Sequence, residues 1–188
     1  MAQAATTGVQ TLENLVGGTL VRKAAITVLG SLFLAAMSQI AVGWPVPTTL
    51  QTLAVILIGL TFGFRLATAT LALYLFEGAM GLPVFAQFKP LLPLGPSAGY
   101  LLGFFFQAAI IAFLVDRGFA RGFVGAAIAV VIGEIVMFAC GALWLSTFMA
   151  QPTFAENFNA ALTVGVYPFL AIDLVKAALA IVIGMGVI

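Results

Sequence analysis

The stretch SAGYLLGFFFQAAIIAFLV, residues 97–115, carries no charged side chain and ends at Asp116-Arg117-Gly118. A transmembrane helix needs about 20 consecutive apolar residues, so this stretch is long enough to cross a bilayer. Its apolar residues follow one another without the polar–apolar alternation that marks the strands of a membrane barrel. The stretch therefore predicts a membrane-spanning helix and an all-α fold.

The composition of the chain supports the same prediction. Of the 188 residues, 63% are apolar and only 7% are charged. Soluble domains are about 25% charged, so this chain has too few charges to cover a water-facing surface. With seven Lys/Arg against six Asp/Glu, it also lacks the basic patch that a nucleic-acid partner would require. The composition indicates an integral membrane protein whose surroundings are the lipid bilayer.

Residue types that the chain lacks argue against an enzyme. It has no histidine and a single cysteine, Cys140, so the usual ligands of zinc and haem are missing, as is the histidine of a catalytic triad. No Gly-x-x-x-x-Gly-Lys-Ser/Thr sequence occurs, so any ATP-driven work must be done by another protein. We therefore expect neither catalysis nor a cofactor or metal in this chain.

Breaks at proline, glycine and charge divide the chain into six apolar runs. The runs cover residues 24–42, 49–64, 66–81, 97–115, 122–148 and 161–188. At about 20 residues per crossing, they predict a single membrane domain over residues 1–188, folded as a six-transmembrane-helix bundle after a cytoplasmic N-terminal segment, residues 1–22. The polar stretch 149–159 is expected to be a loop before the sixth helix.

Positive charges predict the orientation of the bundle. If the chain crosses six times, most basic residues of the connecting segments fall on one side, and Lys89 falls on the other. The first group comprises Arg22, Lys23, Arg65, Arg117 and Arg121. Because an excess of Lys and Arg marks the cytoplasmic side, both termini are expected in the cytoplasm of a multi-pass protein of the plasma or inner membrane. The three loops after the first, third and fifth helices then face outside.

Asp173 and Lys176 are charged residues inside the last apolar run. Residues three apart share one face of a helix, and a charge in the hydrocarbon region costs several kcal/mol unless it is paired or hydrated. The two residues therefore either lock the bundle as an internal ion pair or form a polar site for a ligand with donors and acceptors. Asp173 is expected well below the outer end of a helix that begins near residue 161.

Two further carboxylates stand inside predicted helices. Glu77 is near the outer end of the third helix, and Glu134 is deeper in the fifth. Either could pair with Lys176 or serve a proton path, and a hydrated helix end would also account for Glu77. The sequence assigns no obvious partner to Glu134.

Polar and aromatic residues gather in the breaks that face the outer side. Residues 46–52 read VPTTLQT and residues 85–100 read FAQFKPLLPLGPSAGY. Thr48 suits a helix N-cap, but capping does not explain Gln51, whose amide is costly to bury without a partner. Apolar walls with a few aimed polar groups are what a small-molecule pocket needs. The simpler alternative for the second segment is an external loop of turn residues.

Four motifs in order carry a resemblance to a known family. They are PVPTTLQTL at residues 45–53, GLPVFA at 81–86, GPSAGYLLGF at 95–104, and PFL at 168–170 followed by Asp173 and Lys176. In this order they resemble the BioY family, the biotin-binding S components of energy-coupling-factor (ECF) transporters. The resemblance implies a six-helix bundle that binds biotin from outside, with an ECF transmembrane coupling protein and ABC ATPase subunits as partners. The chain departs from many members at residues 89–94, KPLLPL, and at Ala171-Ile172.

The chemistry of biotin assigns a role to each candidate residue. Biotin has a ureido ring with N–H donors and a carbonyl acceptor, an apolar thioether ring and a carboxylate tail. Asp173 would accept from a ureido N–H, and Lys176 or Lys89 would meet an oxygen; which lysine meets the carboxylate stays open. The polar shell would be completed by Gln51, Thr48 and Gln87, and the rings would be covered by Trp44, Phe85, Phe88 and Tyr100.

Two functions are compatible with the sequence. The first is a binding subunit that captures biotin at the outer face and depends on a separate ATPase. The second is a self-sufficient ion-coupled vitamin transporter that uses Asp173, Glu77 and Glu134 as a proton relay. Such carriers usually show two matched halves, and no internal repeat is visible here. A homo-oligomer is left open in either case.

Overall fold

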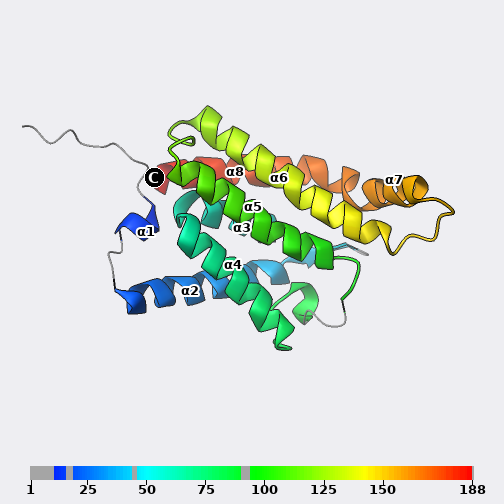
Figure 1. Cartoon of the computed structure of the whole chain (residues 1–188), viewed down its shortest axis with the longest axis horizontal. Helices are drawn as coiled ribbons and strands as arrows, with labels where there is room; N and C mark the ends of the chain where they lie inside the picture. The colour runs from blue at the N-terminus through cyan, green and yellow to red at the C-terminus, as the bar shows by residue number, and fades with distance from the viewer. Residues whose placement is uncertain (1–10, 16–18, 44–45, 90–93, 188) are drawn as a thin grey trace, which may run out of the picture.

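The computed structural model describes residues 11–15, 19–43, 46–89 and 94–187, and it is almost entirely helical (Figure 1). In chain order the helices are α1 (Leu12–Leu15), α2 (Leu20–Gln39), α3 (Gln51–Thr61), α4 (Phe64–Ala79), α5 (Ala98–Asp116), α6 (Phe123–Ser146), α7 (Phe154–Gly165) and α8 (Tyr167–Val187). A short 3-10 helix, η1 (Ala86–Phe88), follows α4. The strands β1 (Ala41–Val42) and β2 (Thr48–Thr49) form a small antiparallel pair in which Ala41 faces Thr49.

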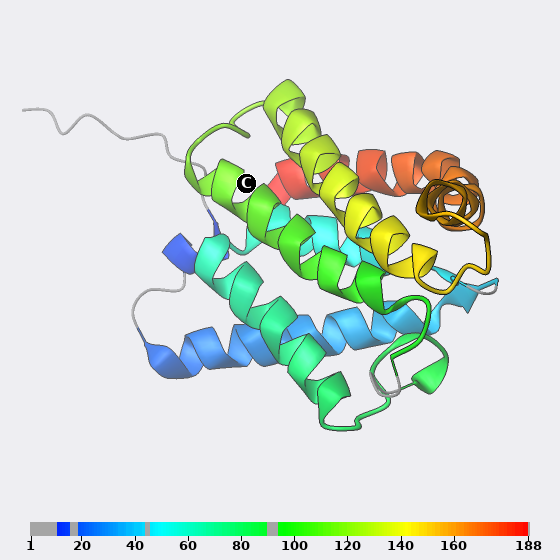
Figure 2. The same ribbon diagram turned by 45° about the vertical axis from the view of Figure 1, so that its right-hand side comes forward.

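Helix α3 lies in the middle of the bundle. It packs against α5 and α8, while α2 packs against α4, and α5 and α6 run side by side (Figures 1 and 2). Its sequence, QTLAVILIGLT, is apolar around nearly the whole circumference, and almost every residue of it is buried. A helix that is hydrophobic all round belongs inside a bundle, so the sequence of α3 accounts for its central position.

The outward faces of the long helices are strongly apolar. Large side chains such as Leu29 on α2, Ile135 on α6 and Leu174 on α8 are exposed. Among the described residues, four helices, α2, α5, α6 and α8, are long and apolar enough to cross a membrane. These features confirm the predicted all-α membrane class. Helix α3 has 11 residues, which at 1.5 Å per residue span about 16 Å, so the count of six crossings stays a prediction.

The last apolar run consists of two helices, not one. Helix α7 begins inside the stretch that was expected to be a loop, because Thr153 and Glu156 form a capping box: the amide of Glu156 donates to Thr153 Oγ1 (3.2 Å), and the amide of Thr153 donates to Glu156 Oε2 (3.1 Å). The helix ends at Gly165, and Pro168 lies in the first turn of α8. Proline is tolerated there but would break a continuous helix. Asp173 therefore lies only about two turns from the start of its helix.

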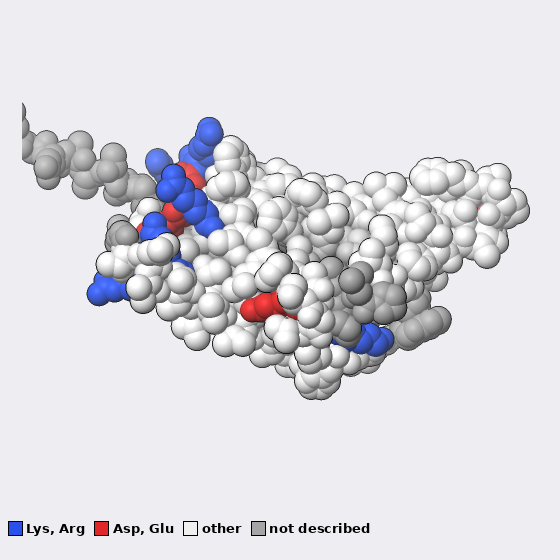
Figure 3. All heavy atoms as spheres, turned by 60° about the horizontal axis from the view of Figure 1, so that its bottom comes forward, with Lys and Arg blue, Asp and Glu red and all other residues white. Residues whose placement is uncertain are grey.

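Charged residues gather at one end of the bundle (Figure 3). Arg65, Arg117 and Arg121 line one depression there, and Glu13 of α1 contacts Arg65, with 3.8 Å between Oε1 and Nε. Asp116 accepts a hydrogen bond from the amide of Phe64 (2.9 Å) and so ties the end of α5 to the start of α4. The structure thus brings these three arginines together, as the sequence predicted. Which side of the membrane this end faces stays a prediction.

Candidate ligand-binding cavity

A cavity opens at the opposite end of the bundle, between the first turns of α3, α5 and α8, the middle of α6 and the segment around η1. Eight of the ten predicted site residues line it: Thr48, Gln51, Phe85, Gln87, Lys89, Tyr100, Asp173 and Lys176. Trp44 lies outside the described residues. Phe88 does not line the cavity and is 70% exposed. The cavity therefore draws together residues that are more than a hundred positions apart in the chain.

The charged residues of α8 form a buried cluster with the start of α3. Lys176 Nζ makes an ion pair with Asp173 Oδ1 and also donates to the Thr49 carbonyl (2.8 Å) and to Thr52 Oγ1 (3.1 Å). Thr52 Oγ1 in turn donates to Asp173 Oδ1 (3.2 Å). An ammonium has three N–H donors, so these three acceptors satisfy it completely. The ammonium therefore has the additional hydrogen bonds that a buried ion pair needs.

The Asp173 carboxylate is less fully used than the ammonium. Within the described part of the chain, both of its contacts go to Oδ1. An ionised carboxylate has two oxygens and about four acceptor sites. Asp173 also lines the cavity, so a carboxylate with unused acceptor sites stands at the cavity wall.

Gln51 links three parts of the chain below the cavity. Its Nε2 donates to the hydroxyl of Tyr74 on α4 (2.8 Å), and its Oε1 accepts from Thr49 Oγ1 (3.1 Å). The hydroxyl of Tyr74 continues the chain of bonds to the Val84 carbonyl (3.1 Å). The buried amide thus has the partners that the sequence could not supply. Since an amide nitrogen carries two donors, Gln51 Nε2 has one donor without a partner among the described residues.

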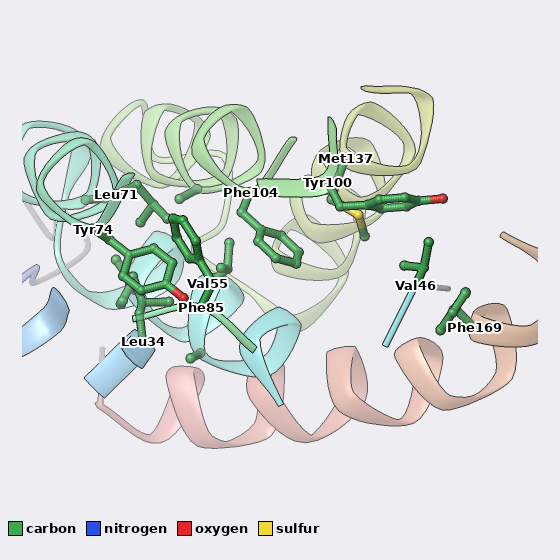
Figure 4. Close-up of a cluster of buried hydrophobic side chains, with 14 of the residues drawn as sticks. Leu34, Val46, Val55, Leu71, Tyr74, Phe85, Tyr100, Phe104, Met137 and Phe169 are labelled. Carbon is green, nitrogen blue, oxygen red and sulfur yellow. The ribbon is translucent and has the colours of Figure 1, made fainter. Parts of the chain in front are cut away.

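Aromatic side chains form the walls of the cavity. The Tyr100 hydroxyl donates to the Gly165 carbonyl (2.7 Å), and Phe85 packs edge-on against Tyr74 with ring centroids 5.0 Å apart. Figure 4 shows Tyr100 and Met137 on one side and Phe169 facing them from α8. A Cβ atom at Gly141 would overlap the ring of Tyr100, so glycine at this position is what lets the ring lie flat against α6.

Several lining residues were missed by the sequence analysis. They are Thr49, Thr52, Leu101, Phe104, Met137, Phe138 and Phe169. Phe104 and Phe169 could have been found, because each stands four residues from a predicted site residue on the same helix, Tyr100 and Asp173, and so shares its face. Met137 and Phe138 lie in the middle of an apolar run, where nothing in the sequence distinguishes a cavity wall from a lipid-facing side chain.

The turn at η1 explains the position of Phe88. Gln87 and Phe88 both have positive φ, 61° and 56°, which is uncommon for residues other than glycine. Gln39 at the end of α2 holds the turn, because its Nε2 donates to the Phe85 carbonyl (3.1 Å) and its Oε1 accepts from the Phe88 amide (3.0 Å). The turn leaves Gln87 and Lys89 at the rim of the cavity and the Phe88 ring outside it.

Among the described residues, neither Glu77 nor Glu134 pairs with Lys176. Glu77 accepts a hydrogen bond from Ser31 Oγ on α2, and Glu134 accepts one from Gln107 Nε2 on α5 (3.1 Å). The suggested pairing of either residue with Lys176 is therefore wrong. The reason is geometric: among the described residues, the ammonium already has Asp173, Thr49 and Thr52 as its acceptors.

Comparison with known proteins agrees with this geometry. Residues 4–188 match the model of the BioY family. The "Probable biotin transporter BioY" of Pyrococcus horikoshii is 38% identical over 150 residues, which are 79% of this chain and 83% of that protein. The "Biotin transporter BioY" of Thermotoga maritima is 34% identical over 143 residues, 75% of this chain and 80% of that protein. A 2.1 Å crystal structure of the S-component for biotin from an ECF-type ABC transporter has a TM-score of 0.75 at 25% identity and covers 90% of this chain and 94% of its own.

Proposed function

Because this chain belongs to the BioY family, we propose that it is the substrate-binding subunit of a biotin uptake system and that it holds biotin in the cavity between α3, α5 and α8. The family and the long apolar helices identify the chain as a multi-pass protein of the plasma membrane. Its relatives are named as transporters, and it is a transport subunit rather than an enzyme.

The observation that carries the proposal is the buried Asp173–Lys176–Thr52 cluster at the wall of a cavity that is otherwise largely aromatic and apolar. A ureido N–H of biotin donates to Oδ2 of Asp173, the oxygen without a protein contact among the described residues. The ureido carbonyl replaces one of the two neutral acceptors of Lys176. The thioether ring then packs between Tyr100, Phe104 and Phe169. This arrangement gives one ureido N–H and the ureido carbonyl each a buried polar partner.

The carboxylate tail is assigned to the mouth of the cavity. Lys89 is exposed at the rim, whereas the side chain of Lys176 is 7% exposed. A carboxylate loses much free energy when it leaves water, so it is better placed at a hydrated rim than beside the Asp173 carboxylate. Lys89 rather than Lys176 therefore receives the tail.

The cavity is proposed to face outside. The opposite end of the bundle, which carries Arg65, Arg117 and Arg121 and is called the arginine end here, is proposed to face the cytoplasm, because an excess of Lys and Arg marks the inner side. Six helices, α2 to α6 and α8, then cross the membrane, and α7 lies at the outer end. The resemblance to the S-component of an ECF-type ABC transporter supports a transmembrane coupling protein and ABC ATPases as partners that drive release inward.

Binding of radiolabelled biotin to the purified chain in detergent tests the proposal. We expect saturable binding without ATP and without an ion gradient, because the cavity and its polar cluster belong to this chain alone. Desthiobiotin, which keeps the ureido ring, should compete, whereas a fatty acid of similar length should not. An absence of saturable biotin binding to folded protein would contradict the proposal.

Lys89 provides a test of how the ligand is oriented. Replacing Lys89 with Gln should weaken biotin binding by up to about five-fold, since an exposed ion pair contributes about 0.2–1 kcal/mol. Biotin amide, which lacks the tail charge, should bind the variant and the parent chain equally well. The matched control is Lys23→Gln at the arginine end. Equal losses for biotin and its amide would show that Lys89 does not meet the carboxylate.

A further inference from the structure

Gln107 and Glu134 form a second polar pair, one helical turn deeper in the bundle than the cavity. Gln107 follows Phe104 by three residues on α5, and Glu134 precedes Met137 by three residues on α6; Phe104 and Met137 both line the cavity. Gln107 is fully buried, and its Nε2 donates to Glu134 Oε1 (3.1 Å). The pair therefore joins two neighbouring helices immediately below the wall of the cavity.

The other two side-chain oxygens of this pair lack hydrogen-bond donors among the described residues. Gln107 Oε1 and Glu134 Oε2 are both buried, and neither has a hydrogen-bond partner among the described residues. Both are acceptors when the carboxylate is ionised, so two buried acceptors would lack a donor. A protonated carboxyl group carries one O–H donor. One proton on Glu134 Oε2 would thus satisfy both orphan oxygens, since the amide and the acid would exchange two hydrogen bonds.

Other donors fit the site less well. A bridging water needs space, but the helices are in close contact here: a Cβ atom at Gly133 would lie 3.1 Å from Gln107 Cγ and 3.0 Å from Ile111 Cγ1. A metal cation such as Ca²⁺ takes six to eight oxygen ligands, and no cluster of three candidate metal-binding residues occurs in the described ranges. An ionised, unpaired carboxylate at this depth is costly.

Among the described residues, Glu134 has no ion-pair partner. Helix α6 packs against α5, α7 and α8. Helix α5 presents the neutral Gln107, and α8 presents Asp173 and Lys176, which are paired with each other. On α7 the charged residue is Glu156, which closes its own capping box. An ionised Glu134 would add a second negative charge near Asp173 and compete with it for Lys176.

We propose that Glu134 is a proton-binding site inside the bundle, with its Oε2–H donated to Gln107 Oε1 and its charge thereby kept away from the Asp173–Lys176 pair. Because a protonated Glu134 carries no charge, Lys176 stays paired with Asp173, and this pair lines the cavity. Loss of the proton from Glu134 would draw Lys176 toward the ionised Glu134 and disturb the ligand site. This last consequence rests on the proposed function, whereas the proton site itself does not.

Infrared spectroscopy of the purified protein tests the proton directly and uses no biotin. The parent chain at neutral pH should show the carbonyl band of a protonated carboxyl group, and Glu134→Gln should lose that band. The matched control, Glu77→Gln, should leave it unchanged. Absence of the band from the parent chain, or its persistence in Glu134→Gln, would overturn the proposal and indicate an ionised Glu134.

Two variants separate the proton from a merely structural contact. Glu134→Gln replaces the O–H donor with an N–H donor, so its thermal midpoint should equal that of the parent chain. Exchange of the two groups, Gln107→Glu with Glu134→Gln, should restore the carboxyl band because an acid again faces an amide. Failure of the folded exchange variant to show the band would overturn the reciprocal pairing. Loss of biotin binding alone, with the band intact, would count against the proposed function only.

Discussion

Replacing Asp173 with Asn is expected to weaken biotin binding by about 100-fold or more. The asparagine Oδ1 can still accept from Lys176 and Thr52, so the fold should survive. The atom offered to the ligand becomes an N–H donor, which faces a ureido N–H donor. Hydrogen bonds to charged groups contribute about 1.5–3 kcal/mol, and leaving the polar groups of both partners unpaired adds to the loss. Equilibrium binding of labelled biotin measures the change.

Asp116→Asn serves as the matched control for this experiment. Asp116 lies at the arginine end, where its Oδ2 accepts from the amide of Phe64, and asparagine can accept the same bond. The control should bind biotin like the parent chain. If Asp173→Asn binds biotin with unchanged affinity while it stays folded, then Asp173 is not a ligand contact and the cluster is an internal lock between α3 and α8.

Replacing Lys176 with Met is expected to have the largest effect on stability. Methionine fills a similar volume but leaves the Asp173 carboxylate buried without its counter-ion. Breaking a buried ion pair by removing one partner costs about 3–5 kcal/mol, so the midpoint of thermal unfolding in detergent should fall markedly. Biotin binding should fall as well, because the donor for the ureido carbonyl is lost.

The double replacement, Asp173→Asn with Lys176→Met, separates these two effects. It removes both charges, and neutral replacements for a buried ion pair are often as stable as the pair itself. Thermal stability should therefore return toward that of the parent chain, whereas biotin binding should not. Recovery of both properties would contradict a direct role of the pair in binding. Recovery of neither would indicate that the charges are needed for folding.

Much of the architecture was predictable, because the bilayer imposes a strong constraint on sequence. Backbone groups in lipid must be satisfied within the segment, so long apolar runs indicate helices. The runs at 97–115 and 122–148 correspond closely to α5 and α6. The division of this region into α7 and α8 was missed, although the capping signal of α7, Thr153 with Glu156, and Pro168 at the start of α8 are in the sequence. The apolar run at residues 161–188 is continuous, and it therefore predicted a single helix.

The candidate site was predictable where a residue was anomalous for its surroundings. Asp173, Lys176 and Gln51 attracted attention because burying them in an apolar chain requires partners. The partners themselves were not predictable, since they come from distant segments: Thr52 for Asp173 and Tyr74 for Gln51. The same holds for Gln107, an amide in the middle of the apolar run 97–115, whose partner Glu134 comes from another helix.

The sequence alone established that this is a helical membrane protein of a particular family. The signals were the order of the apolar runs, the scarcity of charge and the four motifs, and all of these depend on residues that are neighbours in the chain. The tertiary structure alone decided which oxygen of Asp173 lacks a contact among the described residues, which helices form the aromatic walls, why Phe88 lies outside the cavity and which amide contacts Glu134. Each of these depends on contacts between segments that are far apart in the chain, and the sequence carries no local signal for such contacts.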